Sequence, residues 1–201
     1  MENVVVSIFD IESEAFQAFS ELKQFGQTEN TKLAQASIVK AENGVVNVKD
    51  SFDLMDSLGD DYFEGGLIGS LIGILGGPLG VLFGFAAGGA IGASVGSDKE
   101  LANSVLITTV SNKLTNGEVA IIALVQENDE SVLNAIFEKY QVDIARWDVA
   151  TVAAEIESAL KIQEDLEHQA KARLIADKKE ARREKFDKLK ASIKEKFSKK
   201  N

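Results

Sequence analysis

Few side chains in this sequence have the types and spacing that catalysis or metal binding requires. His168 is the only histidine, and Glu164, one helical turn earlier, is the one side chain well placed to share a metal ion with it. A cluster of carboxylates offers oxygen ligands for a divalent cation but lacks the D-x-[DN]-x-[DN]-G spacing of a calcium loop. Its members are Asp56, Asp60, Asp61 and Glu64. For both groups a solvated surface is the favoured interpretation.

Other common catalytic patterns are missing from the sequence. There is no cysteine, which excludes thiol and disulfide chemistry. Neither a GxGxxG nor a GxxxxGK[ST] phosphate-binding motif occurs, and the glycine-rich segment contains no lysine. A single histidine in the charged C-terminal region gives no plausible Ser-His-acid set. We therefore expect a protein that is not an enzyme and that holds no metal or cofactor.

The most informative feature is a charge-free segment of 33 residues, Gly65 to Ser97, whose glycines recur every four residues. Positions four apart lie on one face of a helix, so the segment predicts faces without side chains, where another helix can approach closely. Each glycine costs about 1 kcal/mol relative to alanine in a helix interior, so this many glycines indicate a packing role. The positions predicted to form the hairpin and its self-association face are Gly65, Gly69, Gly73, Gly77, Pro78, Gly80, Gly84, Gly88, Gly92 and Gly96.

This segment predicts a helical hairpin that turns at Gly77-Pro78, with arms at residues 64–75 and 79–97. At 1.5 Å per residue the arms reach about 18 and 28 Å, against about 30 Å for the hydrocarbon core of a bilayer. Two interpretations remain open. The hairpin either enters or crosses a membrane with both ends on one side, or it packs between subunits of a soluble oligomer. Nearby acidic residues disfavour insertion and the basic C-terminal region favours it.

The remaining sequence predicts an α+β fold in which a ferredoxin-like antiparallel sheet carries the glycine-rich hairpin as an insertion. Hydrophobic runs indicate strands at residues 4–9, 32–40, 45–49, 119–126 and 142–149, with Asn43-Gly44 as a hairpin turn. Helical spacing indicates helices at 13–25, 98–114 and 129–140, the last capped by Asp129. Residues 50–64 are expected to be irregular or a short helix.

The domain organisation follows from these elements. The ferredoxin-like domain is expected in two parts, residues 1–63 and 98–150, with the hairpin at 64–97 and a long charged helix at 151–201. The last region contains no proline and no glycine and is rich in Ala, Glu, Lys and Leu, a composition that favours a helix.

Charge is divided unevenly along the chain. From His168 onward there are 13 Lys/Arg against 5 Asp/Glu, while the preceding residues hold 9 against 27. The final turns predict a basic amphipathic helix, in which four apolar residues follow one another at spacings of 3, 4 and 4. Its apolar and basic residues include Arg182, Arg183, Lys185, Phe186, Leu189, Lys190, Ile193 and Phe197.

Three interpretations of this basic tail are open: a solvated helix, a helix lying on anionic lipid, or a nucleic-acid-binding helix. The third is disfavoured, because two phenylalanines and a basic stripe do not form a fold that contacts bases.

The order of a strand-helix-hairpin opening, a GLIGSLIGILGGPLG block, a helix and the strand NGEVAIIALV resembles the uncharacterised bacterial DUF1269 family. The resemblance covers roughly residues 3 to 157 and leaves out the basic tail. It implies a membrane protein, and it implies neither catalytic residues nor a cofactor.

Together these features predict a non-enzymatic protein that assembles with itself through the glycine-rich hairpin, with its basic tail on anionic lipid. Because the first residues lack the pattern of a secretory signal, we expect it on the cytoplasmic side of the cell membrane. The alternative is a soluble cytoplasmic scaffold whose hairpin is a subunit interface.

Overall fold

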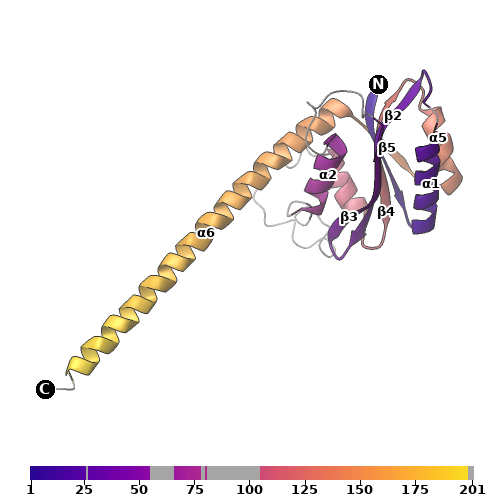
Figure 1. Ribbon diagram of the computed structural model, residues 1–201. Helices are drawn as coiled ribbons and strands as arrows, with labels where there is room; N and C mark the ends of the chain where they lie inside the picture. Colours follow the sequence, from indigo (N-terminus) through magenta and orange to yellow (C-terminus); the bar gives the residue numbers. More distant parts are fainter. Residues whose placement is uncertain (26, 55–65, 78–79, 81–104, 199–201) are drawn as a thin grey trace. The chain divides into compact units, whose positions relative to one another are not determined.

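The computed structural model describes residues 1–25, 27–54, 66–77, 80 and 105–198. The chain divides into two units, Met1–Leu160 and Lys161–Asn201. The first unit is an antiparallel sheet with helices on both faces (Figure 1), and the described part of the second unit is helical.

The sheet of the first unit has five strands in the order β3-β2-β4-β1-β5, and every neighbouring pair is antiparallel. The strands are β1 (Glu2–Phe9), β2 (Thr31–Glu42), β3 (Val45–Asp53), β4 (Val119–Glu127) and β5 (Ile144–Asp148). This confirms the predicted antiparallel α+β class, while the ferredoxin-like assignment stays a prediction. Two of the three inner strands, β4 and β1, consist mainly of buried Val, Ile and Ala, as expected for strands covered on both faces.

One face of the sheet is covered by α1 (Glu12–Gln24) and α5 (Ser131–Phe137), which is followed by a short 3₁₀ turn, η3 (Glu138–Tyr140). Buried residues of α1, among them Ala15, Phe19 and Leu22, recur at helical spacing and pack on alternate residues of the strands. The ring centroids of Phe9 and Phe137 lie 6.3 Å apart in this core. The Asp129 carboxylate accepts a hydrogen bond from the Ser131 N–H at 2.9 Å and lies at the start of α5, as predicted.

Figure 1 shows α2 (Gly66–Gly76) on the opposite face, where it packs against β2, β3, β4 and the neighbouring helix α4 (Val105–Lys113). The first turns of α6 (Val149–Ser198) belong to the same unit, and Val152 and Ile156 are buried there. The Glu155 carboxylate accepts hydrogen bonds from the backbone N–H groups of Leu106 and Ile107, at 3.1 and 3.4 Å. It therefore supplies an acceptor for donors in the first described turn of α4.

The hairpin turn at Asn43-Gly44 is confirmed, with φ angles of 55° and 78°. In a two-residue turn of this kind both central residues need positive φ, which asparagine and glycine tolerate. The expectation that residues 50–53 are irregular is wrong, because they pair with residues 35–38 of β2. A register shift between Ile38 and Val39 lets β3 continue beyond the point where its hydrophobic pattern ends.

Candidate self-association site

The glycine-rich helix α2 has two chemically different sides. Leu67 is half-buried, and the other larger apolar side chains are buried: Ile68, Leu71, Ile72, Ile74 and Leu75. Their spacing of three and four residues places them on one side of the helix, which covers the sheet of its own domain. The described part of the predicted first arm is therefore part of the folded unit.

The other side of α2 carries two open glycines, Gly69 and Gly73, one helical turn apart. Both are exposed, and apart from the adjoining residues and backbone of α2 itself no described atom lies within 4 Å of the position that a Cβ would occupy at either one. Substitutions there meet no steric obstacle within the described part of the chain. The helix therefore presents a short, smooth surface of the kind that permits close helix-helix approach.

Other glycines of the segment are required by the fold itself. At Gly76 a Cβ would lie 2.8 Å from the Val46 carbonyl oxygen, so glycine lets α2 approach β3 closely. At Gly80 it would overlap the Leu75 carbonyl oxygen, which leaves no room for a side chain. These two residues share the four-residue spacing of the segment, but at each of them a backbone carbonyl occupies the place that an open face would require.

The remaining predicted hairpin positions are only partly described. Gly77 directly follows α2, is half-buried, and donates its N–H to the Ile74 carbonyl at 3.3 Å. The positions outside the described residues are Gly65, Pro78, Gly84, Gly88, Gly92 and Gly96.

Among the described helices, none combines the length and the apolar character that crossing a bilayer requires.

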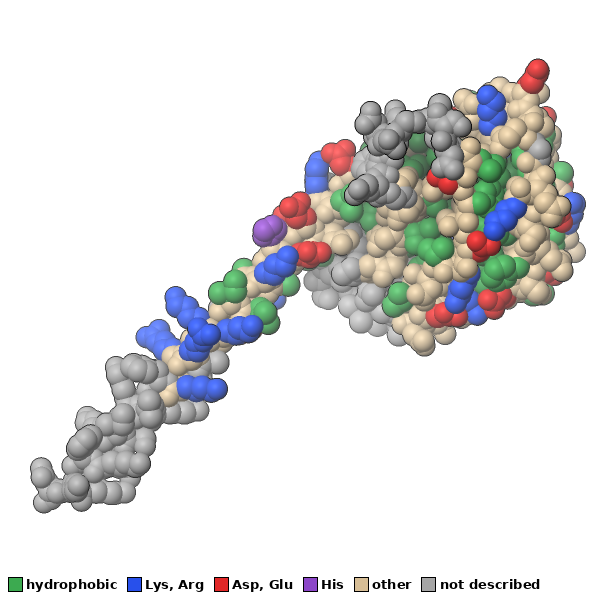
Figure 2. Space-filling model, viewed as in Figure 1, with side chains coloured by type: hydrophobic (Ala, Val, Ile, Leu, Met, Phe, Trp, Pro, Cys, Tyr) green, Lys and Arg blue, Asp and Glu red, His purple; other side chains and the backbone are tan. Residues whose placement is uncertain are grey.

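The predicted basic tail lies in the C-terminal part of α6. Arg182, Arg183 and Lys185 are exposed there, and the positions of Phe186, Leu189, Lys190, Ile193 and Phe197 belong to the same helix. Figure 2 shows Lys and Arg side chains gathering on α6 beyond His168, while acidic side chains lie near the histidine itself. His168 is exposed, and no group of three or more potential metal ligands occurs among the described residues.

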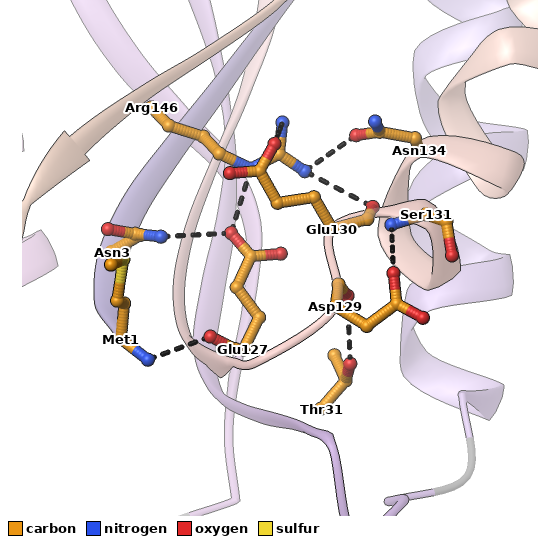
Figure 3. Close-up of polar contacts among 9 residues, drawn as sticks. All are labelled: Met1, Asn3, Thr31, Glu127, Asp129, Glu130, Ser131, Asn134 and Arg146. Carbon is orange, nitrogen blue, oxygen red and sulfur yellow. Dashed lines mark hydrogen bonds and ion pairs between the residues drawn. The ribbon is translucent and has the colours of Figure 1, made fainter.

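A buried ion pair that the sequence did not reveal connects β4 and β5 (Figure 3). The Arg146 Nε donates to the Glu127 carboxylate at 2.8 Å, and Asn3 donates to the same oxygen at 3.1 Å. The Arg146 guanidinium also donates to the Asn134 side-chain oxygen of α5, at 2.6 Å. The Glu127 side chain is only 1% exposed, so this network is part of the framework and does not form an open site.

A groove of about 670 Å³ lies beside β1, β5 and α4. Val6, Val110 and Trp147 contribute apolar surface, and the described lining also includes charged residues of both signs. The described lining contains no serine or cysteine nucleophile and no histidine that could act as its base.

These observations define a class of protein: an antiparallel α+β body with a glycine-rich segment packed on its sheet and a charged C-terminal helix. The family described as "Protein of unknown function (DUF1269)" matches residues 63–167, slightly more than half of the chain. The chain belongs to this family, which confirms the resemblance seen in the sequence. The match begins at the glycine-rich segment and ends within α6. No curated protein and no solved structure matches the chain.

Proposed function

We propose that this protein is a non-enzymatic assembly protein that associates with itself through the open glycine face of α2 and is attached to a membrane. The observation that carries the proposal is the pair Gly69 and Gly73, both exposed on a helix whose opposite side is buried against the sheet. Rigid attachment to the sheet supports this role, because it fixes the orientation in which the glycine face is presented.

Two features support the membrane part of the proposal. The charge-free segment continues after α2 as far as Ser97, and the C-terminal tail combines basic and apolar residues at helical spacing. The body is proposed to be ferredoxin-like and to lie on the cytoplasmic side of the cell membrane. A soluble scaffold with the same glycine interface is the second candidate, favoured by the burial of α2 against its own sheet.

The self-association can be tested with Gly69→Leu/Gly73→Leu, compared with Gly69→Ala/Gly73→Ala. A Cβ at either position has open space within the described part of the chain, and both variants gain helix propensity, so both are expected to fold at least as stably as the parent. The leucines prevent close helix approach, whereas the alanines largely preserve it. Analytical ultracentrifugation, with and without detergent, is expected to show an oligomer for the parent and the alanine variant and a monomer for the leucine variant. An unchanged mass for the leucine variant would rule out the glycine face as the interface.

The membrane attachment needs a separate test in which α2 is retained. Deleting the whole charge-free segment would remove the helix that covers the sheet, and loss of folding would then obscure the result. A deletion limited to residues 81–97 keeps α2 and Gly80. If the parent resists extraction by alkaline carbonate and this variant does not, the charge-free segment anchors the protein. Extraction of both would favour the soluble scaffold.

A further inference from the structure

The second unit exposes two adjacent apolar side chains on α6, Leu174 at 56% and Ile175 at 67%. They lie beyond the acidic group formed by Glu164, Asp165 and Glu167, at the start of the basic part of the helix. From residue 171 to 198 there are 11 Lys/Arg against 5 Asp/Glu. Ile175 and Leu174 therefore combine apolar surface with a basic environment, and neither is needed for a core within the described part of their unit.

Helical geometry separates these two neighbours. Ile175 lies 11 positions before Phe186 and 18 before Ile193, distances that correspond to about three and five complete turns of an α-helix. Ile175 therefore occupies the same face as the apolar positions of the tail. Leu174 is rotated by roughly 100° from it. It lies on the side of the helix that carries Leu166 and Ala170, at intervals of four residues.

We propose that Ile175 is the first apolar contact of the tail with anionic lipid, so that the lipid-binding surface runs from Ile175 to Phe197. This inference rests on the lipid-binding role proposed for the tail and extends that surface by three turns toward the N-terminus. The acidic group at 164–167 sets its limit, because carboxylates are repelled by an anionic surface. Lys171, Lys178 and Arg182 lie within about 60° of Ile175 around the helix and supply the complementary charge.

Charge also decides between lipid and a second copy of the same helix as the occupant of this surface. Two copies side by side would bring together two segments that each carry an excess of six positive charges, which repel one another. An anionic lipid surface neutralises that excess and accepts the apolar stripe below it. The surface therefore fits lipid better than it fits itself.

The test is binding of the full-length protein to vesicles of phosphatidylcholine mixed with phosphatidylserine, compared with phosphatidylcholine vesicles alone. Ile175→Ser and Leu174→Ser form a matched pair, since both replace an exposed apolar residue by serine at neighbouring positions of one helix. Removing a lipid-buried isoleucine is expected to weaken partitioning about five- to twentyfold, whereas the leucine variant should bind like the parent. Circular dichroism checks that both variants retain the same helix content.

Arg182→Glu/Arg183→Glu distinguishes failure of this inference from failure of the proposed lipid role. If the charge reversal abolishes binding but Ile175→Ser does not weaken it, the tail binds lipid and Ile175 is not part of the surface. Equal losses for Ile175→Ser and Leu174→Ser would also overturn the inference, because no particular face would then be in contact. If the parent does not bind, or binds both vesicle types equally, the anionic-lipid role itself is wrong.

Discussion

Two ion pairs, one in the body and one in the second unit, hold their charges in opposite environments. In the body, Glu127 and Arg146 form an ion pair whose side chains are 1% and 14% exposed. In the second unit, Glu167 and Lys171 form a pair one turn apart with side chains 53% and 72% exposed. The body, residues 1–160, has 8 Lys/Arg against 24 Asp/Glu, and the second unit has 14 against 8.

This contrast separates charges that stabilise a fold from charges that are available to a partner. A buried ion has lost its hydration, so removing its partner is costly. An exposed pair keeps most of its hydration and contributes between zero and about 1 kcal/mol. We therefore expect substitutions of buried charges in the body to change stability, and substitutions of tail charges to change binding.

The largest expected effect is that of Arg146→Met. The substitution leaves the buried Glu127 carboxylate without its cation and the Asn134 side-chain oxygen without its donor. It should lower the free energy of unfolding by about 3–5 kcal/mol, as measured by urea denaturation. Lys171→Met is the matched control in the second unit and should change it by less than about 0.5 kcal/mol.

A double variant, Glu127→Met/Arg146→Met, shows whether the loss arises from the unpaired charge. Because it removes both ions and leaves apolar side chains of similar size, it should recover much of the stability lost in the single variant. If Arg146→Met and Lys171→Met had equal effects, the distinction between body and tail charges would fail.

A smaller effect is expected for Glu155→Ala. This carboxylate is buried and accepts hydrogen bonds from N–H groups in the first described turn of α4, so its removal takes this acceptor away from them. The free energy of unfolding is expected to fall by about 1–3 kcal/mol. Glu155→Gln should lower it less, since one side-chain oxygen can still accept a hydrogen bond. Hydrogen exchange at Leu106 and Ile107 should accelerate in the alanine variant. Glu164→Ala, an exposed carboxylate of the same helix, serves as the control and should leave this exchange unchanged.

The sequence predicted those parts of the fold that depend on local signals. The β-branched run of β1, the Asn43-Gly44 turn and the uninterrupted α6 region are specified by neighbouring residues, and all three are confirmed. The extension of β3 was missed because pairing with β2 stabilises it, and pairing between strands leaves little trace in a single sequence.

The candidate site was predicted less completely, for a related reason. A four-residue glycine repeat identifies close helix packing, but it does not say which glycines face the sheet and which face outward. Gly76 packs closely against Val46, 30 positions away, whereas Gly73 has open space beside it. The pairing of Glu127 with Arg146 was missed as well, because it depends on where β5 lies in the sheet.

The smallest effect concerns Tyr140, a half-buried residue that lies between the two extremes of burial compared above. Its hydroxyl donates to the Glu21 carboxylate at 2.7 Å, and Lys139 donates to the same carboxylate at 2.5 Å. Burial and the nearby Glu21 raise the pKa of Tyr140 from 10.0 to about 12. The folded state therefore retains the phenol proton at a pH where the unfolded chain releases it.

The sign of the pH dependence follows from this difference in pKa. The stabilisation that Tyr140 provides is present in full below pH 10 and is lost as the pH rises toward 12. Absorbance of tyrosinate should show one ionisation step near pH 12 in the folded parent, and Tyr140→Phe should lack it. Because the variant has no phenol to ionise at this position, its unfolding free energy should fall less than that of the parent between pH 10 and 12. If Tyr140 ionised near its ordinary pKa, the fold would not hold its proton, and this prediction would be wrong.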